Sequence, residues 1–269
     1  MSKEKNYGDW VDTEKGEVFN SIYEQISYET EQITSQDEYL MRSISAYLGR
    51  KNSTYDRYLY PKTYNSAIDI LNNLSYNVIA AAIDTLVAKL SEVDILPKSI
   101  TNKSTAEGRQ LANNMNGIIN GLYNKYDIQQ KIIDEYRDAM VWRTGFMKMG
   151  LDENDEFFLE RVYKNEITVD AVDSYYNNPY KIIQKKIIPK SVLLQKFSNF
   201  SEEIEELLPI ELRMGETNYS TQGILVVEAW CKNSYKKGGR HVICVQNADL
   251  LDEKWDKNFL PIIKADFQR

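Results

Sequence analysis

The chain has 269 residues and a mass of 31.3 kDa, a size that suits one large domain or two smaller ones. Its hydrophobic content of 42% and charged content of 27% are ordinary for a globular protein and exclude global disorder and a fibrous repeat. The net charge of −7 argues against a broad face that binds nucleic-acid phosphates.

Two cysteines and one histidine are too few for a four-ligand structural zinc site or a disulfide framework. No apolar run approaches the roughly 18–20 residues that span a bilayer. The chain also starts with charged residues where a secretory signal would be apolar. We therefore expect a soluble protein, cytoplasmic where it is made, with no membrane contact.

Residues 1–64 are expected to form an acidic helical arm and a loop. Residues 1–40 carry ten acids and three lysines, and apolar residues recur there at helical spacing, which predicts one or two amphipathic helices. These apolar residues are Val18, Ile22, Ile26, Ile33 and Leu40. The acidic run is either a solvated helix face or an interaction arm. Gly49 and Pro61 predict the loop that follows.

Residues 65–143 are expected to be helical. The strongest helix is predicted over residues 66–96, because apolar residues keep the i, i+3, i+4 spacing up to Pro97. Its apolar content predicts a buried scaffold helix. A second helix, capped by Thr101 or Ser104, has one apolar face formed by Leu111, Met115, Ile118, Ile119 and Leu122. A third helix, from Asp127 to Trp142, has a face formed by Ile128, Ile132, Ile133, Tyr136 and Met140.

Residues 144–269 are expected to be rich in β-strands, because the apolar period changes from 3.6 to 2 at Gly145. Paired strands are predicted over 146–149 and 157–163, and further strands over 167–169, 180–188 and 260–267. A short helical insertion is expected near 189–212. We also expect Trp142, Phe146 and Tyr163 to share one core where the third helix meets the first hairpin.

A further hairpin is predicted from residues 224–232 and 240–246. Pairing of Lys232 with Arg240 would place Cys231 opposite His241. The sequence therefore predicts an α+β fold, in which N-terminal amphipathic helices are followed by antiparallel strands and hairpins.

Motifs that carry chemistry are incomplete in this sequence. Gly145 and Gly150 have the spacing of a phosphate loop, but Leu151 and Asp152 stand where its lysine and hydroxyl residue would be. Residues 152–156 resemble the start of a calcium loop that lacks its glycine and its bidentate glutamate. His241 has no paired nucleophile in a known motif, so a structural hydrogen-bonding role is expected. We predict no catalytic, cofactor-binding or metal-binding residues, no cofactor, and no enzymatic activity.

Three regions resemble the portal proteins of tailed bacteriophages with double-stranded DNA, which are also called head-to-tail connectors. The first region is the helix at residues 77–90. The second is the helix-to-strand passage at 136–148, together with the stretch at 160–170. The third comprises Glu228-Ala229-Trp230, residues 239–243 and residues 250–255. The resemblance covers roughly residues 65–267, with the regions in the family's order and spacing.

The resemblance implies that the chain is the N-terminal wing portion of a portal subunit, with residues 65–143 as the helical part of the wing and 144–269 as its β-rich part. The family's stem, clip and crown would follow Arg269, so the chain is expected to be truncated before the stem. Such a protein is structural and located in the virion at one capsid vertex, and it is assembled in the bacterial host cytoplasm. It forms a ring, usually of twelve subunits, through which the genome is packaged and ejected.

The resemblance also implies several partners. They are other portal subunits, capsid and scaffold proteins, terminase, tail or adaptor proteins, and double-stranded DNA that passes through the channel without sequence specificity. Two other functions remain open: an acidic adaptor or regulatory protein that binds a basic partner, and an enzyme whose site is assembled from dispersed carboxylates.

Overall fold

The computed structural model describes residues 9–48, 77–93, 95–102, 105–152, 156–170, 173, 178–213, 220–235 and 238–266. The chain divides into two compact units, and each unit combines two separate stretches of sequence. The first unit comprises Met1–Thr34 and Asn165–Leu260, and the second comprises Ser35–Lys164 and Pro261–Arg269. These boundaries differ from the three consecutive segments predicted above, because contacts between distant parts of the chain define both units.

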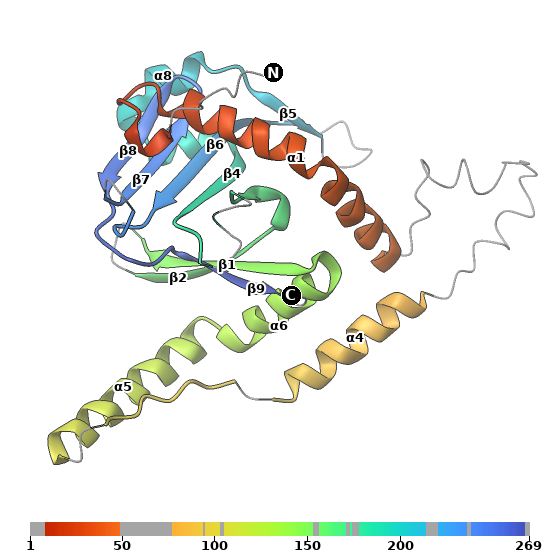
Figure 1. The fold of residues 1–269 in the computed structure, drawn as a ribbon, viewed down its shortest axis with the longest axis vertical. Helices are drawn as coiled ribbons and strands as arrows, with labels where there is room; N and C mark the ends of the chain where they lie inside the picture. The colour runs from red at the N-terminus through yellow and green to blue at the C-terminus, as the bar shows by residue number, and fades with distance from the viewer. Residues whose placement is uncertain are drawn as a thin grey trace, which may run out of the picture. The chain divides into compact units, whose positions relative to one another are not determined.

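A six-stranded antiparallel sheet forms the centre of the first unit (Figure 1). Its main path runs in the order β3-β4-β6-β7-β8, and β5 pairs with the start of β6. The strands are β3 (Ile167–Thr168), β4 (Lys181–Pro189), β5 (Ile210–Arg213), β6 (Ser220–Cys231), β7 (Arg240–Val245) and β8 (Ala248–Lys254). Strand β6 pairs with β4 on one side and β7 on the other, so it anchors the sheet.

The N-terminal segment covers one face of this sheet. A short 3-10 helix, η1 (Trp10–Asp12), precedes helix α1 (Val18–Tyr47), which starts in the first unit and continues into the second. The buried side chains on this face are Trp10, Val18, Phe19, Ile22, Ile26, Ile183, Val227, Ala229, Cys231, Val242 and Cys244. The helical spacing predicted for residues 18–26 is therefore confirmed as the core-facing stripe of α1, and the start of the expected arm is part of a core.

The opposite face of the sheet packs against the helical insertion. This insertion contains α7 (Lys190–Lys196), η4 (Ser198–Phe200) and α8 (Ser201–Glu206). The buried residues here are Leu193, Ile204, Leu207, Ile224, Val226, Val245 and Leu250. Val226 and Val227 point to opposite faces because successive strand residues alternate, so the sheet is buried on both sides. The insertion ends earlier than 212, since residues 210–213 pair with β6 as strand β5.

The second unit contains a three-stranded antiparallel sheet in the order β2-β1-β9, together with helices that follow α1 in the chain. The strands are β1 (Thr144–Leu151), β2 (Phe157–Val162) and β9 (Ile262–Asp266), and the helices are α4 (Val78–Ser91), α5 (Ala106–Lys125) and α6 (Ile128–Trp142). The predicted first hairpin is confirmed, with Phe146 opposite Val162. Helix α6 packs on β1, β2 and β9, and α4 packs on α6.

The first predicted helix differs from its expected form. Helix α4 ends at Ser91, before Pro97, and residues 66–76 of the prediction lie outside the described residues, as does most of the loop expected after Tyr47. Only Val87 of α4 is buried, and Val78 and Ile79 are more than half exposed. The prediction of a buried scaffold helix is therefore wrong for α4 in this single chain.

Helix α6 buries a face that periodicity alone did not predict. Its predicted apolar face is only half-buried, whereas Glu135, Asp138 and Ala139 are buried. Asp138 can face inward because Arg161 of β2 forms a two-pronged ion pair with it.

The core predicted where α6 meets the first hairpin is confirmed only in part. Phe146 is buried, and the rings of Trp142 and Tyr163 stack at a centroid distance of 6.0 Å. However, Trp142 is half-buried and Tyr163 is exposed, so these two rings form the rim of the core.

Candidate functional site

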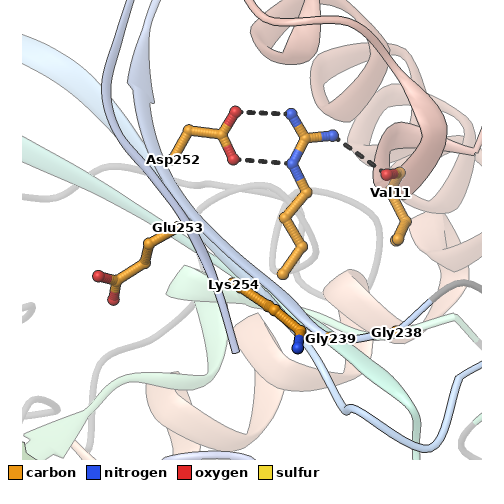
Figure 2. Close-up of a pocket in the computed structure, with 7 residues that line it drawn as sticks. Val11, Gly238, Gly239, Asp252, Glu253 and Lys254 are labelled. Atoms are coloured by element: carbon orange, nitrogen blue, oxygen red, sulfur yellow. Dashed lines mark hydrogen bonds and ion pairs between the residues drawn. The ribbon is translucent and has the colours of Figure 1, made fainter. Parts of the chain in front are cut away.

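A hollow of about 290 Å³ lies in the first unit, where the N-terminal segment meets strands β7 and β8 (Figure 2). It is lined by Val11, Gly238, Gly239, Arg240, Asp252, Glu253 and Lys254. The turn before β7 needs glycine at two positions. Gly238 has a φ of +89°, and a Cβ on Gly239 would collide with the carbonyl oxygen of Trp255.

Arg240 is the central residue of this hollow. Its Nε and Nη2 donate to the two carboxylate oxygens of Asp252, each at 2.9 Å. Its Nη1 donates to three backbone carbonyl oxygens of the N-terminal segment, at 2.8–3.1 Å, and Figure 2 shows one of these contacts, to Val11. The hydrogen bonds from Arg240 hold the pKa of Asp252 below its usual value.

Further polar contacts hold the same segment on the sheet. The carboxylate of Asp9 caps η1, accepts a hydrogen bond from the hydroxyl of Tyr235, and pairs with the ammonium of Lys181 at 3.2 Å. Burial by itself would raise the pKa of Asp9. The contacts with Tyr235 and Lys181 lower this pKa by more than burial raises it, so the pKa of Asp9 lies below its usual value. The backbone N–H of Gly16 donates to Asp249 at 2.6 Å. We call these contacts, together with Arg240, the N-terminal clamp.

His241 lies on β7 next to this hollow, between two carboxylates. Its Nδ1 is 2.9 Å from Glu253 and its Nε2 is 3.1 Å from Glu228. The imidazole ring stacks on Trp230 at a centroid distance of 5.3 Å. Through these contacts His241 of β7 is joined to β6 and β8.

The hairpin that contains His241 is shifted by one residue from its predicted register. Cys231 pairs with Arg240, and Trp230, in place of Cys231, lies opposite His241. A shift of one residue changes which side chains share a face of the sheet, so Cys231 shares its face with Val242 and Cys244, and Trp230 lies beside the imidazole. Burial also raises the pKa of both thiols, Cys231 and Cys244, to about 12, which makes them poor nucleophiles.

The two incomplete motifs found in the sequence, the phosphate-loop and calcium-loop segments, lie in the β1–β2 hairpin. Gly145 lies in β1, where a Cβ would collide with the backbone of Glu135 on α6. A Cβ on Gly150 would meet the ring of Phe158 at 2.8 Å. The Asp152 side chain accepts from the backbone N–H of Glu156 at 2.9 Å and closes the hairpin turn. Both motif sequences therefore serve the β1–β2 hairpin.

Three of the five lysines between 181 and 196 have separate contacts within the chain. Lys181 belongs to the N-terminal clamp, and Lys190 donates to the backbone carbonyl of Glu205 at 2.7 Å. Lys196 lies over the ring of Phe197 at 5.6 Å. Their contacts tie β4 and α7 to the surrounding structure.

Two buried acids in the second unit were not found from the sequence. Glu135 and Asp138 lie one helical turn apart on α6, and only Asp138 pairs with Arg161. One carboxyl oxygen of Glu135 has no hydrogen-bond partner among the described residues. Burial, with a contribution from the nearby Asp138 charge, raises the pKa of Glu135 to about 7. No local pattern in the sequence distinguishes them from Asp134, an acid of the same helix that pairs with Arg137 near the surface.

The charged side chains that line the hollow each have a partner within the chain. The charged groups lining it are engaged: Arg240 with Asp252, Glu253 with His241, and Lys254 with Asp256 at 2.8 Å. Within the described ranges, no three His, Cys, Asp or Glu side chains are grouped so that they could hold a metal ion. None of the helices in the same ranges is both long and apolar enough to cross a membrane.

No protein-family model matches the sequence, and a search of curated proteins finds no match.

Proposed function

We propose that the chain is the wing part of a phage portal subunit, a structural protein of the ring at one capsid vertex. The observation that carries the proposal is the ordered resemblance over roughly residues 65–267. The passage at 136–148 is a helix that turns directly into a strand, α6 into β1, in agreement with the form that the resemblance implies. Residues 228–230 and 240–243 of the third region likewise lie on the paired strands β6 and β7.

The features of the hollow are compatible with a structural role. Its charged side chains bind one another and the N-terminal segment, so the hollow resembles a clamp more than a reaction site. Glu135, the acid with the largest upward shift of pKa, lies outside the residues that line it. The proposal therefore assigns the chain no turnover, and weak, salt-sensitive DNA binding in line with its net charge of −7.

Immunogold electron microscopy of virions tests this function. Antibodies against the purified chain would be applied to particles of the phage that encodes it, with antibodies against its major capsid protein as the control. Label at a single vertex per particle is expected. Label spread over the whole capsid, or label only on material outside particles, would refute the assignment.

A gel-shift assay tests the second part of the proposal. We expect no shift of double-stranded DNA at sub-micromolar protein in about 0.15 M salt, because few cationic groups are available to release counterions. A stable shift under these conditions would contradict the view that DNA only passes by this protein.

A further inference from the structure

Helix α5 is a long helix with little tertiary support. It has 20 residues and none of them is buried. Among the described residues, its main contacts are with α6 at its C-terminal end and with the extended residues 95–100, which run beside it (Figure 1). Ser99 and Asn116 join that extended segment to α5 through two hydrogen bonds of 2.7 and 3.2 Å.

The composition of α5 makes this lack of support significant. Eight of its twenty residues are weak helix formers: Gly108, Asn113, Asn114, Asn116, Gly117, Asn120, Gly121 and Asn124. In a protein, most of the stability of a helix comes from packing of its apolar face. Such a helix needs more contact than the described residues of one chain provide.

Four of the apolar residues of α5 form a narrow stripe with a definite spacing. Leu111, Met115, Ile118 and Leu122 follow one another at intervals of four, three and four residues. This is the spacing of the a and d positions of a coiled coil, which form the seam along which two helices pack. Leu111 is 65% exposed, Met115 43% and Ile118 57%, so three of the four residues of the stripe are exposed in the single chain.

We propose that α5 pairs antiparallel with α5 of a second copy of this chain. An antiparallel alignment centred between residues 116 and 117 places Leu111 opposite Leu122 and Met115 opposite Ile118. The four apolar residues of each copy then fill four layers of one seam. The contact is isologous, because both copies use the same face, and it closes at two copies.

The charges on α5 favour this partner and this direction. In the same alignment Gly108 faces Lys125 of the second copy, and Glu107 lies beside that lysine. Because of the twofold symmetry, the opposite charges meet at both ends of the seam. A parallel pair would instead bring Glu107 to Glu107 and Lys125 to Lys125. Within one chain Lys125 is 3.6 Å from Glu156, but both side chains are more than half exposed.

The inference goes beyond the proposed function. A cyclic ring is built from head-to-tail contacts, whereas this pair uses the same face twice, so the two assemblies would use different surfaces. Failure of the virion labelling would therefore leave the α5 pair intact, and failure of the α5 pair would leave the portal assignment intact.

Sedimentation velocity of the full chain over a range of concentrations tests the pairing. We expect a monomer–dimer equilibrium that is weakened at least about a hundredfold by Ile118→Lys, because a charge would enter the seam. The matched control is Asn113→Lys, which adds the same charge on the exposed opposite face of α5. Circular dichroism of both variants checks that helix content is retained. A wild-type chain that stays monomeric at about 100 μM, or a dimer indifferent to Ile118→Lys, would overturn the inference.

A charge swap tests the same contact without altering the apolar seam. Glu107→Lys alone and Lys125→Glu alone should each weaken the dimer by roughly tenfold, since each creates two unfavourable pairs. The double variant should recover the wild-type affinity. Glu156→Gln should leave the dimer unchanged, because it removes only the partner of Lys125 within the chain. No recovery in the double variant would contradict the antiparallel alignment.

Cross-linking distinguishes the two directions. With a thiol oxidant, a mixture of Leu111→Cys and Leu122→Cys chains should form a mixed disulfide dimer. Neither variant alone should cross-link, because equal positions would lie about 16 Å apart along the seam. The native thiols do not interfere, since Cys231 and Cys244 are fully buried. Efficient cross-linking of Leu111→Cys to itself would show a parallel pair and refute the proposed alignment.

Discussion

Glu135→Gln should make the second unit more stable at high pH and leave it nearly unchanged at low pH. The carboxyl of Glu135 is buried beside Asp138, and its pKa is raised from 4.5 to about 7. An acid with a raised pKa binds its proton more tightly in the folded than in the unfolded chain. Its favourable contribution is therefore complete below pH 4.5 and is lost as the pH rises through 7. Glutamine has a similar shape and cannot ionise.

The size of the effect follows from the shift. Each pKa unit corresponds to about 1.4 kcal/mol, so raising the pKa from 4.5 to about 7 predicts a loss of about 3 kcal/mol in the wild type between pH 4.5 and 8. The variant should not show this loss. The difference in unfolding free energy between variant and wild type should then grow to about 3 kcal/mol in favour of glutamine at pH 8.

Urea unfolding at several pH values between 4.5 and 8.5 measures this difference. Because the chain has two units, hydrogen exchange of peptides from α6 should report the local change, after correction for the intrinsic effect of pH. Asp134→Asn is the matched control, since it removes an acid of the same helix that already pairs with Arg137 near the surface. Parallel stability curves for wild type and Glu135→Gln across this range would refute the reasoning.

Three further outcomes are expected. Arg240→Ala should lower the unfolding free energy by about 3–5 kcal/mol, because it leaves a carboxylate and three backbone carbonyls without their donor. Limited proteolysis should then cut the N-terminal segment faster than in wild type. Phe146→Ala should lower the unfolding free energy measured in urea by about 3–5 kcal/mol, and Trp142→Ala should lower it clearly less, since only the Phe146 ring is fully buried. Equal losses would contradict the placement of Trp142 at the rim of the core. Cys231 and Cys244 should react with a thiol reagent at pH 8 only after unfolding, and rapid labelling of the folded chain would show that they are accessible.

The virion assignment and the α5 pair depend on different observations. The first depends on a sequence resemblance over roughly residues 65–267, and the second on the exposure and spacing of residues along one helix. A dimer in solution would explain how an apolar stripe is protected before or outside any larger assembly. It would not identify that assembly.

Local patterns along the chain were sufficient to predict most secondary structure. The change of period at Gly145 correctly marked the passage from α6 to β1, and alternation predicted β4, β6 and β7. These predictions succeed because each pattern depends on neighbouring residues that share one face of one element. The sequence alone also showed that its phosphate-loop and calcium-loop motifs are incomplete. The structure explains why residue 145 is a glycine, because β1 approaches α6 closely at this position.

Contacts between distant residues could not be predicted in this way. Strand β9 pairs with β1, more than 100 residues earlier, although it follows β8 directly in sequence. Arg240 reaches the backbone of Trp10, and the inward-facing Asp138 depends on Arg161. Periodicity does not contain these pairings, because a charged side chain in a helix or strand looks solvent-exposed until a distant partner of opposite charge is brought to it. The clamp and the buried acids therefore follow from tertiary packing, whereas the elements that carry them follow from local sequence.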